Sequence, residues 1–137
     1  MGTTIKSQLS KKNKHWIEKH RFYELKHFCL QYPIWKKAYL ALDGYYASPL
    51  ITNIQGNSVN KPVEKCAEAK IWYYDRMRMV ERVALDTDEE LHIYLLTGIV
   101  EGLSYDILKA RLNIPCCREV YYDLYRRFFW LLNKARQ

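Results

Sequence analysis

The residues best suited to recognition chemistry lie near the C-terminal end, where arginine and tyrosine follow a short break between two helical patterns. Apolar positions recur at helical spacing over residues 105–112 and about 117–134, and Asn113-Ile114-Pro115 separates the two stretches. Two helices joined by so short a break are typical of a helix-turn-helix, whose second helix can enter the major groove of DNA. The pattern therefore predicts a helix-turn-helix over residues 102–134.

Side chains in and before the second helix offer hydrogen bonds to both parts of a DNA duplex. Arg118 could fork onto guanine O6 and N7, and Tyr122 could touch a phosphate or a thymine methyl. Arg126 and Arg127, two turns later, are better placed for backbone phosphates. Ser104 is expected to cap the first helix, whose free N–H groups could meet a phosphate. The side chains expected to point outward are Arg118, Glu119, Tyr122, Asp123 and Arg126.

A small apolar core must set the angle between these two helices. We expect this core to contain Ile107, Leu108, Leu112, Ile114, Val120, Leu124 and Phe128. Asn113 stands where the chain turns, and asparagine is, after glycine, the residue that best tolerates a left-handed backbone. A helical hairpin with two arginines also fits a plain corner of a helical bundle, and this alternative stays open.

The last helix carries a run of aromatic residues, namely Tyr121, Tyr122, Tyr125, Phe128, Phe129 and Trp130. Such residues more often form core and interface than a platform for stacked bases. From Phe128 to Leu132 the helix is apolar nearly all round, which predicts burial on several sides by the N-terminal helices or by a second subunit. A homodimer is therefore one hypothesis.

The rest of the chain favours further helices and no strand, so the predicted fold class is all-α, a helical bundle with a C-terminal helix-turn-helix. Asp86 or Thr87 is expected to cap a helix that follows them and ends at Gly102. The other expected helices span about 14–31, 33–44 and 62–85.

The predicted organisation has three parts. Residues 1–44 form a basic N-terminal arm with two helices, in which residues 1–13 are given no structure. Residues 45–61 combine Pro, Gly, Asn and Ser without a period, which indicates a long loop or hinge. Residues 62–137 form the helical core with the helix-turn-helix.

The distribution of charge favours a polyanionic partner. The chain of 137 residues has a net charge of +7, with nine Lys or Arg against three acids in residues 1–50 and seven against four in residues 101–137. Positive charge at both ends suits nucleic acid. The polar N-terminus does not resemble a signal peptide, and no stretch is apolar enough to span a bilayer, so a cytoplasmic protein without membrane contact is expected.

The remaining titratable residues give no reason to expect catalysis or a bound metal. The four cysteines lack CxxC spacing, and the four histidines lack the pairing of a zinc helix, so reduced thiols and ordinary packing are expected. The sequence contains no Gly-rich phosphate loop or nucleophile elbow. We therefore predict a protein that is not an enzyme, that uses no metal or cofactor, and that takes no small-molecule substrate.

Three segments carry a resemblance to a known family. They are SPLITNIQGNSVNKPVEKCAEAK (48–70), DEELHIYLLTGIVEGLSYDILKARLNIPCC (88–117) and REVYYDLYRRFFWLL (118–132). They resemble the RinA/ArpU-type group of late-gene transcriptional regulators from phages and prophages of low-GC Gram-positive bacteria. The likeness covers about residues 45–135.

The resemblance implies a helical bundle whose last part is similar to the promoter-reading region of sigma factors and binds DNA to control late phage genes. By motif position it assigns DNA contact to Ser104, Tyr105, Arg118, Tyr122, Arg126 and Arg127. The expected function is sequence-specific regulation of transcription in the cytoplasm of a bacterial host, with double-stranded DNA as partner and host RNA polymerase as a further candidate.

Two other functions compete with this hypothesis. A phage packaging protein of the small-terminase kind would also bind DNA, but it would form a ring. An interaction protein that grips RNA polymerase or another protein through its aromatic C-terminal surface would show little salt-sensitive affinity for DNA.

Overall fold

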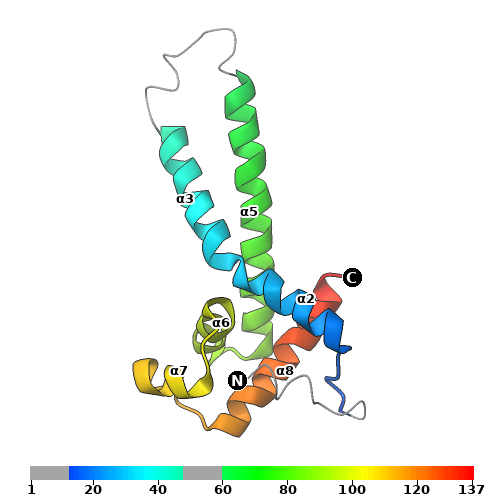
Figure 1. The fold of residues 1–137 in the computed structure, drawn as a ribbon. Coiled ribbons are helices and arrows are strands. Elements are labelled where there is room, and N and C mark those ends of the chain that lie inside the picture. Colours follow the sequence, from blue (N-terminus) through cyan, green and yellow to red (C-terminus); the bar gives the residue numbers. More distant parts are fainter. Residues whose placement is uncertain (1–12, 48–59) are drawn as a thin grey trace. The chain divides into compact units, whose positions relative to one another are not determined.

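Every regular element in the described part of the chain is an α-helix, which confirms the predicted all-α class. The computed structural model describes residues 13–47 and 60–137. Its helices are α2 (Lys19–Leu30), α3 (Tyr32–Ala47), α5 (Asn60–Thr87), α6 (His92–Glu101), α7 (Tyr105–Leu112) and α8 (Arg118–Ala135) (Figure 1). The predicted hinge at 45–61 is helical at both ends, and its residues 48–59 lie outside the described residues.

The chain divides into two compact units, and it passes from one to the other between α2 and α3 and again inside α5. One unit, here called the core unit, comprises residues 13–31 and 79–137 of the described chain. The other, here called the paired-helix unit, comprises residues 32–47 and 60–78.

The core unit is built around contacts of α2 and α6 with α8. Helix α2 packs on both α6 and α8, and α6 also contacts α7. The ring of Phe22 on α2 lies edge-on to Phe129 on α8, with 5.0 Å between the centroids. Nearby, Arg21 Nε donates a hydrogen bond to Asn133 Oδ1 at 2.6 Å. The sequence predicts that the N-terminal helices or a second subunit bury the apolar end of α8. Helix α2 is one of these N-terminal helices, and it covers part of α8.

Helix α6 approaches α8 closely because Gly98 has no side chain. A β-carbon at Gly98 would overlap Tyr121 Oη and would lie 2.8 Å from Leu108 Cδ1. Gly98 is buried, and Tyr121 and Leu108 are 1% and 0% exposed. The missing side chain therefore lets α6, α7 and α8 share one core.

Two helices begin later in the chain than expected, α2 at Lys19 and α6 at His92. Helix α2 begins at Lys19 rather than near residue 14, because the carboxylate of Glu18 accepts a hydrogen bond from Arg21 N at 3.0 Å. The prediction that Asp86 or Thr87 caps the helix after α5 is wrong. Thr87 ends α5 and donates to Val83 O, whereas Asp88 Oδ1 accepts from the N–H groups of Glu90 and Leu91 at 2.9 and 2.8 Å.

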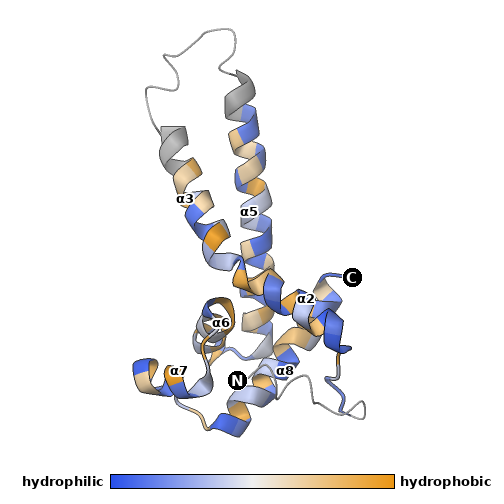
Figure 2. Ribbon diagram, in the orientation of Figure 1, coloured by the Kyte–Doolittle hydropathy of each residue, from blue (hydrophilic) through white to orange (hydrophobic). Residues whose placement is uncertain are grey.

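In the paired-helix unit, α3 runs beside the first part of α5 (Figure 1). The rings of Tyr39 on α3 and Tyr74 on α5 lie 6.2 Å apart, and Lys70 Nζ lies 5.0 Å from the Tyr39 ring centroid. Polar and apolar residues alternate in bands along α5 (Figure 2). The two helices therefore touch through aromatic and cation–π contacts near their middles.

Candidate nucleic-acid interface

The turn between α7 and α8 has the conformation that its sequence predicts. Asn113 adopts the left-handed backbone (φ 51°, ψ 50°), and its N–H donates to Lys109 O at 3.1 Å. Ile114 follows and is fully buried, while Lys109 Nζ donates to its carbonyl oxygen at 3.2 Å. The buried isoleucine and the lysine bond hold this turn in one shape.

Helix α7 begins at the predicted cap. Ser104 has an extended backbone, and its Oγ accepts a hydrogen bond from Ile107 N at 3.3 Å. Asp106 lies in the first turn, where a carboxylate suits the positive end of the helix dipole. The capping bond predicted for Ser104 is therefore confirmed.

Tyr122 does not point outward, so this part of the predicted interface is wrong. Its side chain is only 5% exposed, and its Oη accepts a hydrogen bond from Tyr105 N at 3.3 Å. Tyr105 is buried as well, and its hydroxyl donates to Cys116 O at 2.5 Å. Burial of a ring is favourable when its hydroxyl finds a partner. Both tyrosines join α7 to the start of α8.

The predicted apolar core between α7 and α8 is only partly correct. Leu108, Ile114 and Phe128 are fully buried, and Leu124 is half-buried. Three other predicted members are largely on the surface, namely Ile107, Leu112 and Val120 with 37%, 44% and 43% exposure. Their places in the core are taken by Tyr121, Tyr122 and Tyr125. The core thus faces α2 and α6 as well as α7.

The aromatic residues of α8 pack in the core of the protein, as their pattern predicts. Large rings recur along one side of this helix and contact each other at centroid distances of 5.0 to 6.1 Å. The buried members are Tyr121, Tyr122, Tyr125, Phe128 and Phe129. The opposite side of α8 is left for solvent.

Arg118, in the first turn of α8, is held by α7. Its Nη2 lies 2.6 Å from Asp106 Oδ1, and its guanidinium carbon lies 5.7 Å from the ring centroid of Tyr105. The side chain of Arg118 remains 51% exposed. This arginine is oriented by an acid and an aromatic face, but it is still accessible to a ligand.

The other charged candidates differ in accessibility. Glu119, Asp123 and Arg127 are exposed on the outer side of α8. Arg126 forms an ion pair with Asp123, and its side chain is only 18% exposed. The structure thus brings Arg118, Glu119, Asp123 and Arg127 to the surface, and it buries most of Arg126.

Three basic residues near Trp130, in the second half of α8, were not among the predicted DNA contacts. This basic group consists of Lys14, His15 and Lys134. The His15 ring lies 5.2 Å from that of Trp130, and Lys134 Nζ lies 3.6 Å from the Trp130 centroid. Partial burial lowers the pKa of His15, and the charges of Lys14 and Arg127 lower it further. Positive charge therefore collects on this side of α8. The lysines of the N-terminal segment were the only sequence signal for it.

Metal ligation and membrane crossing can each be checked against the side chains and helices that the structure describes. Within residues 13–47 and 60–137, no three His, Cys, Asp or Glu side chains gather as metal ligands would. None of the helices described there has both the length and the apolarity to cross a membrane. All four cysteines are free thiols, and burial raises the pKa of Cys29.

Comparisons with models of protein families, with curated proteins and with solved structures found no match. The family resemblance of the three segments therefore stays a prediction.

Proposed function

We propose that this protein binds double-stranded DNA through α7 and α8, with the first turns of α8 in the major groove. The observation that carries the proposal is the α7–turn–α8 unit, in which a left-handed Asn113 and a buried Ile114 join two helices and the first turn of the second helix stays exposed. This is the arrangement through which helix-turn-helix proteins present side chains to base edges.

The exposed residues of α8 can divide the work between bases and phosphates. Arg118, oriented by Asp106, is suited to paired hydrogen bonds with guanine, and Glu119 or Asp123 can accept from the amino group of cytosine. Arg127 and the basic group with Lys14 and Lys134 are suited to phosphates, as at the end of other recognition helices. Tyr105 and Tyr122 act here as positioning residues.

The biological process is inferred from the family resemblance. We infer that DNA binding regulates the transcription of late phage or prophage genes in the cytoplasm of a bacterial host. RNA polymerase is the natural second partner of such a regulator. No residue in this proposal has a catalytic role.

The test is DNA binding by the whole chain, with operators selected from a pool of random sequences. Arg118→Ala should relax the preference at one base pair by about 1–3 kcal/mol, because one paired contact is lost. Arg127→Ala should weaken binding to all sequences about equally and reduce the salt slope by about one. Fluorescence anisotropy over a range of salt concentrations measures both effects.

Lys37→Ala is the matched control, because it removes one exposed cation from α3, outside the proposed interface. It should leave both affinity and preference unchanged. Enrichment of no sequence, together with an affinity insensitive to salt, would contradict DNA binding and favour the protein-interaction alternative. A ring-shaped oligomer on DNA would favour the packaging alternative.

A further inference from the structure

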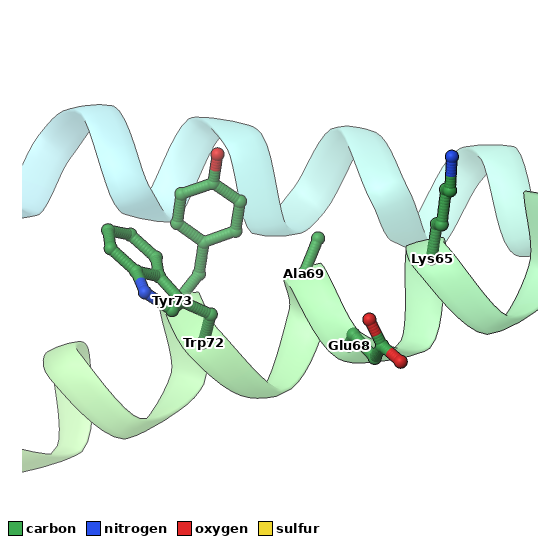
Figure 3. A pocket seen from close by; sticks show the side chains of 5 residues that line it. All are labelled: Lys65, Glu68, Ala69, Trp72 and Tyr73. Carbon is green, nitrogen blue, oxygen red and sulfur yellow. The ribbon is translucent and has the colours of Figure 1, made fainter.

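The paired-helix unit carries a hollow on the surface of α5 with a large exposed tryptophan beside it. The hollow measures about 430 Å³ and is lined by Lys65, Glu68, Ala69, Trp72 and Tyr73 (Figure 3). The indole of Trp72 is 46% exposed although it touches Tyr73 edge-on at 5.1 Å. A half-exposed tryptophan next to a hollow is typical of an interface anchor.

Charged residues flank this tryptophan on one straight ridge of the helix. Glu68, Trp72 and Arg76 follow each other at intervals of four, so their side chains lie in a row along α5. The Arg76 guanidinium stacks on the Trp72 ring at 3.5 Å, and its Nη1 donates to Trp72 O at 3.1 Å. The row therefore reads acid, aromatic and base, with the tryptophan at its centre.

We propose that this ridge binds the same ridge of a second copy of the chain, with the two α5 helices antiparallel. A two-fold axis at Trp72 would reverse one ridge relative to the other, so each Glu68 would face the Arg76 of the other copy. Such an interface is self-complementary, as closed two-fold dimers require. A parallel arrangement would instead set acid against acid and base against base.

The small number of buried side chains in the paired-helix unit also supports binding of a second copy of the chain. Among its described side chains only Trp35 and Met77 are buried, whereas Ile71 beside the ridge is 60% exposed. A two-fold axis at Trp72 would keep the Ile71 side chains of both copies on the same flank of the contact, where they would lie near each other. The interface would then combine two tryptophan anchors with apolar flanks and two ion pairs.

Sedimentation of the purified chain without DNA tests this proposal independently of the proposed function. The wild type should shift from one chain toward two as its concentration rises. Trp72→Ala should weaken association about 30-fold or more, because an interface anchor is lost. Leu40→Ala removes an apolar side chain of 57% exposure from α3 and should not change the dissociation constant.

Charge reversal tests the orientation of the two helices. Glu68→Arg and Arg76→Glu should each weaken self-association on the order of tenfold, because both ion pairs become repulsive. An equal mixture of the two variants should form heterodimers, and the variant with both changes should associate like the wild type. Circular dichroism checks that each variant keeps its helix content.

Three results would overturn the proposal: a wild-type chain that is monomeric at every concentration, a dimer that survives Trp72→Ala, or a mixture that associates no better than its components. The mixing experiment remains decisive even if Trp72→Ala does not fold.

Discussion

The core unit and the paired-helix unit are both made of amphipathic helices, yet they bury very different shares of their apolar residues. In the core unit, Tyr121, Phe128 and Phe129 on α8 are at most 1% exposed. In the paired-helix unit, Ile34 and Ile71 are 66% and 60% exposed. A helix covered on several sides can bury large residues around much of its circumference, whereas two helices cover only the stripe where they meet.

We expect the core unit to supply most of the stability and the paired-helix unit to supply a binding surface. The core unit has a closed set of aromatic and aliphatic contacts that fixes the α7–turn–α8 geometry. The paired-helix unit keeps apolar and aromatic residues in reach of a partner. A proposed DNA-binding unit needs a rigid base, and a proposed dimer contact needs exposed anchors.

The largest expected effect is on the free energy of unfolding, when one leucine in each unit is replaced by alanine. Leu25→Ala should reduce the free energy of unfolding by about 2–5 kcal/mol, because Leu25 is 0% exposed and its loss leaves a cavity. Leu40→Ala should change it by less than about 0.5 kcal/mol, because Leu40 is 57% exposed. Urea denaturation followed by circular dichroism measures both values. Similar losses at the two sites would remove the distinction between the units.

The next effect concerns the close approach of α6 and α8. Gly98→Ala should cost about 1–3 kcal/mol, because the added methyl group would overlap Tyr121 Oη and press on Leu108. Adding Tyr121→Phe should recover part of this loss, because it removes one of the two obstructions. Thermal unfolding of the single and double variants measures the coupling.

Thr97→Ala serves as the control for Gly98, because it changes the neighbouring, half-buried position of the same helix. Its effect should be well below that of Gly98→Ala. A Gly98→Ala variant as stable as the wild type would mean that α6 can move away from α8 at no cost.

The elements of the candidate site were predictable where the signal is local. The span of α7, the cap at Ser104 and the left-handed Asn113 all depend on residues within one turn of each other. Capping and backbone preferences act over that distance, so the sequence alone was sufficient for these features.

The orientation of α8 was not predicted correctly, because it depends on helices distant in sequence. Aliphatic residues such as Val120 were assigned to the core, but α2 and α6 cover the side that carries Tyr121, Tyr122 and Tyr125. The spacing of the largest rings along α8 was a usable signal for this side. The group of His15 with Trp130 was missed for the same reason, since it joins residues far apart in the chain.

The smallest expected effect separates two neighbouring tyrosines that are both buried. Among the residues that the structure describes, Tyr121 Oη has no hydrogen-bond partner, and burial raises the pKa of this hydroxyl. Tyr122 Oη accepts a hydrogen bond from Tyr105 N. Tyr121→Phe should therefore raise the free energy of unfolding by about 1 kcal/mol, because a buried unsatisfied group is removed. Tyr122→Phe should lower it by a similar amount, because the Tyr105 N–H loses its acceptor.

The opposite signs make this pair of variants its own control, since each removes one hydroxyl from the same turn of α8. Urea denaturation gives the two free energies, and DNA affinity gives a second readout. Tyr122→Phe should also weaken specific DNA binding, because Tyr122 positions the start of α8 against α7, while Tyr121→Phe should leave it unchanged. Equal destabilisation by both variants would mean that Tyr121 Oη has a partner in solution, and that the α6–α8 contact at Gly98 is looser than described.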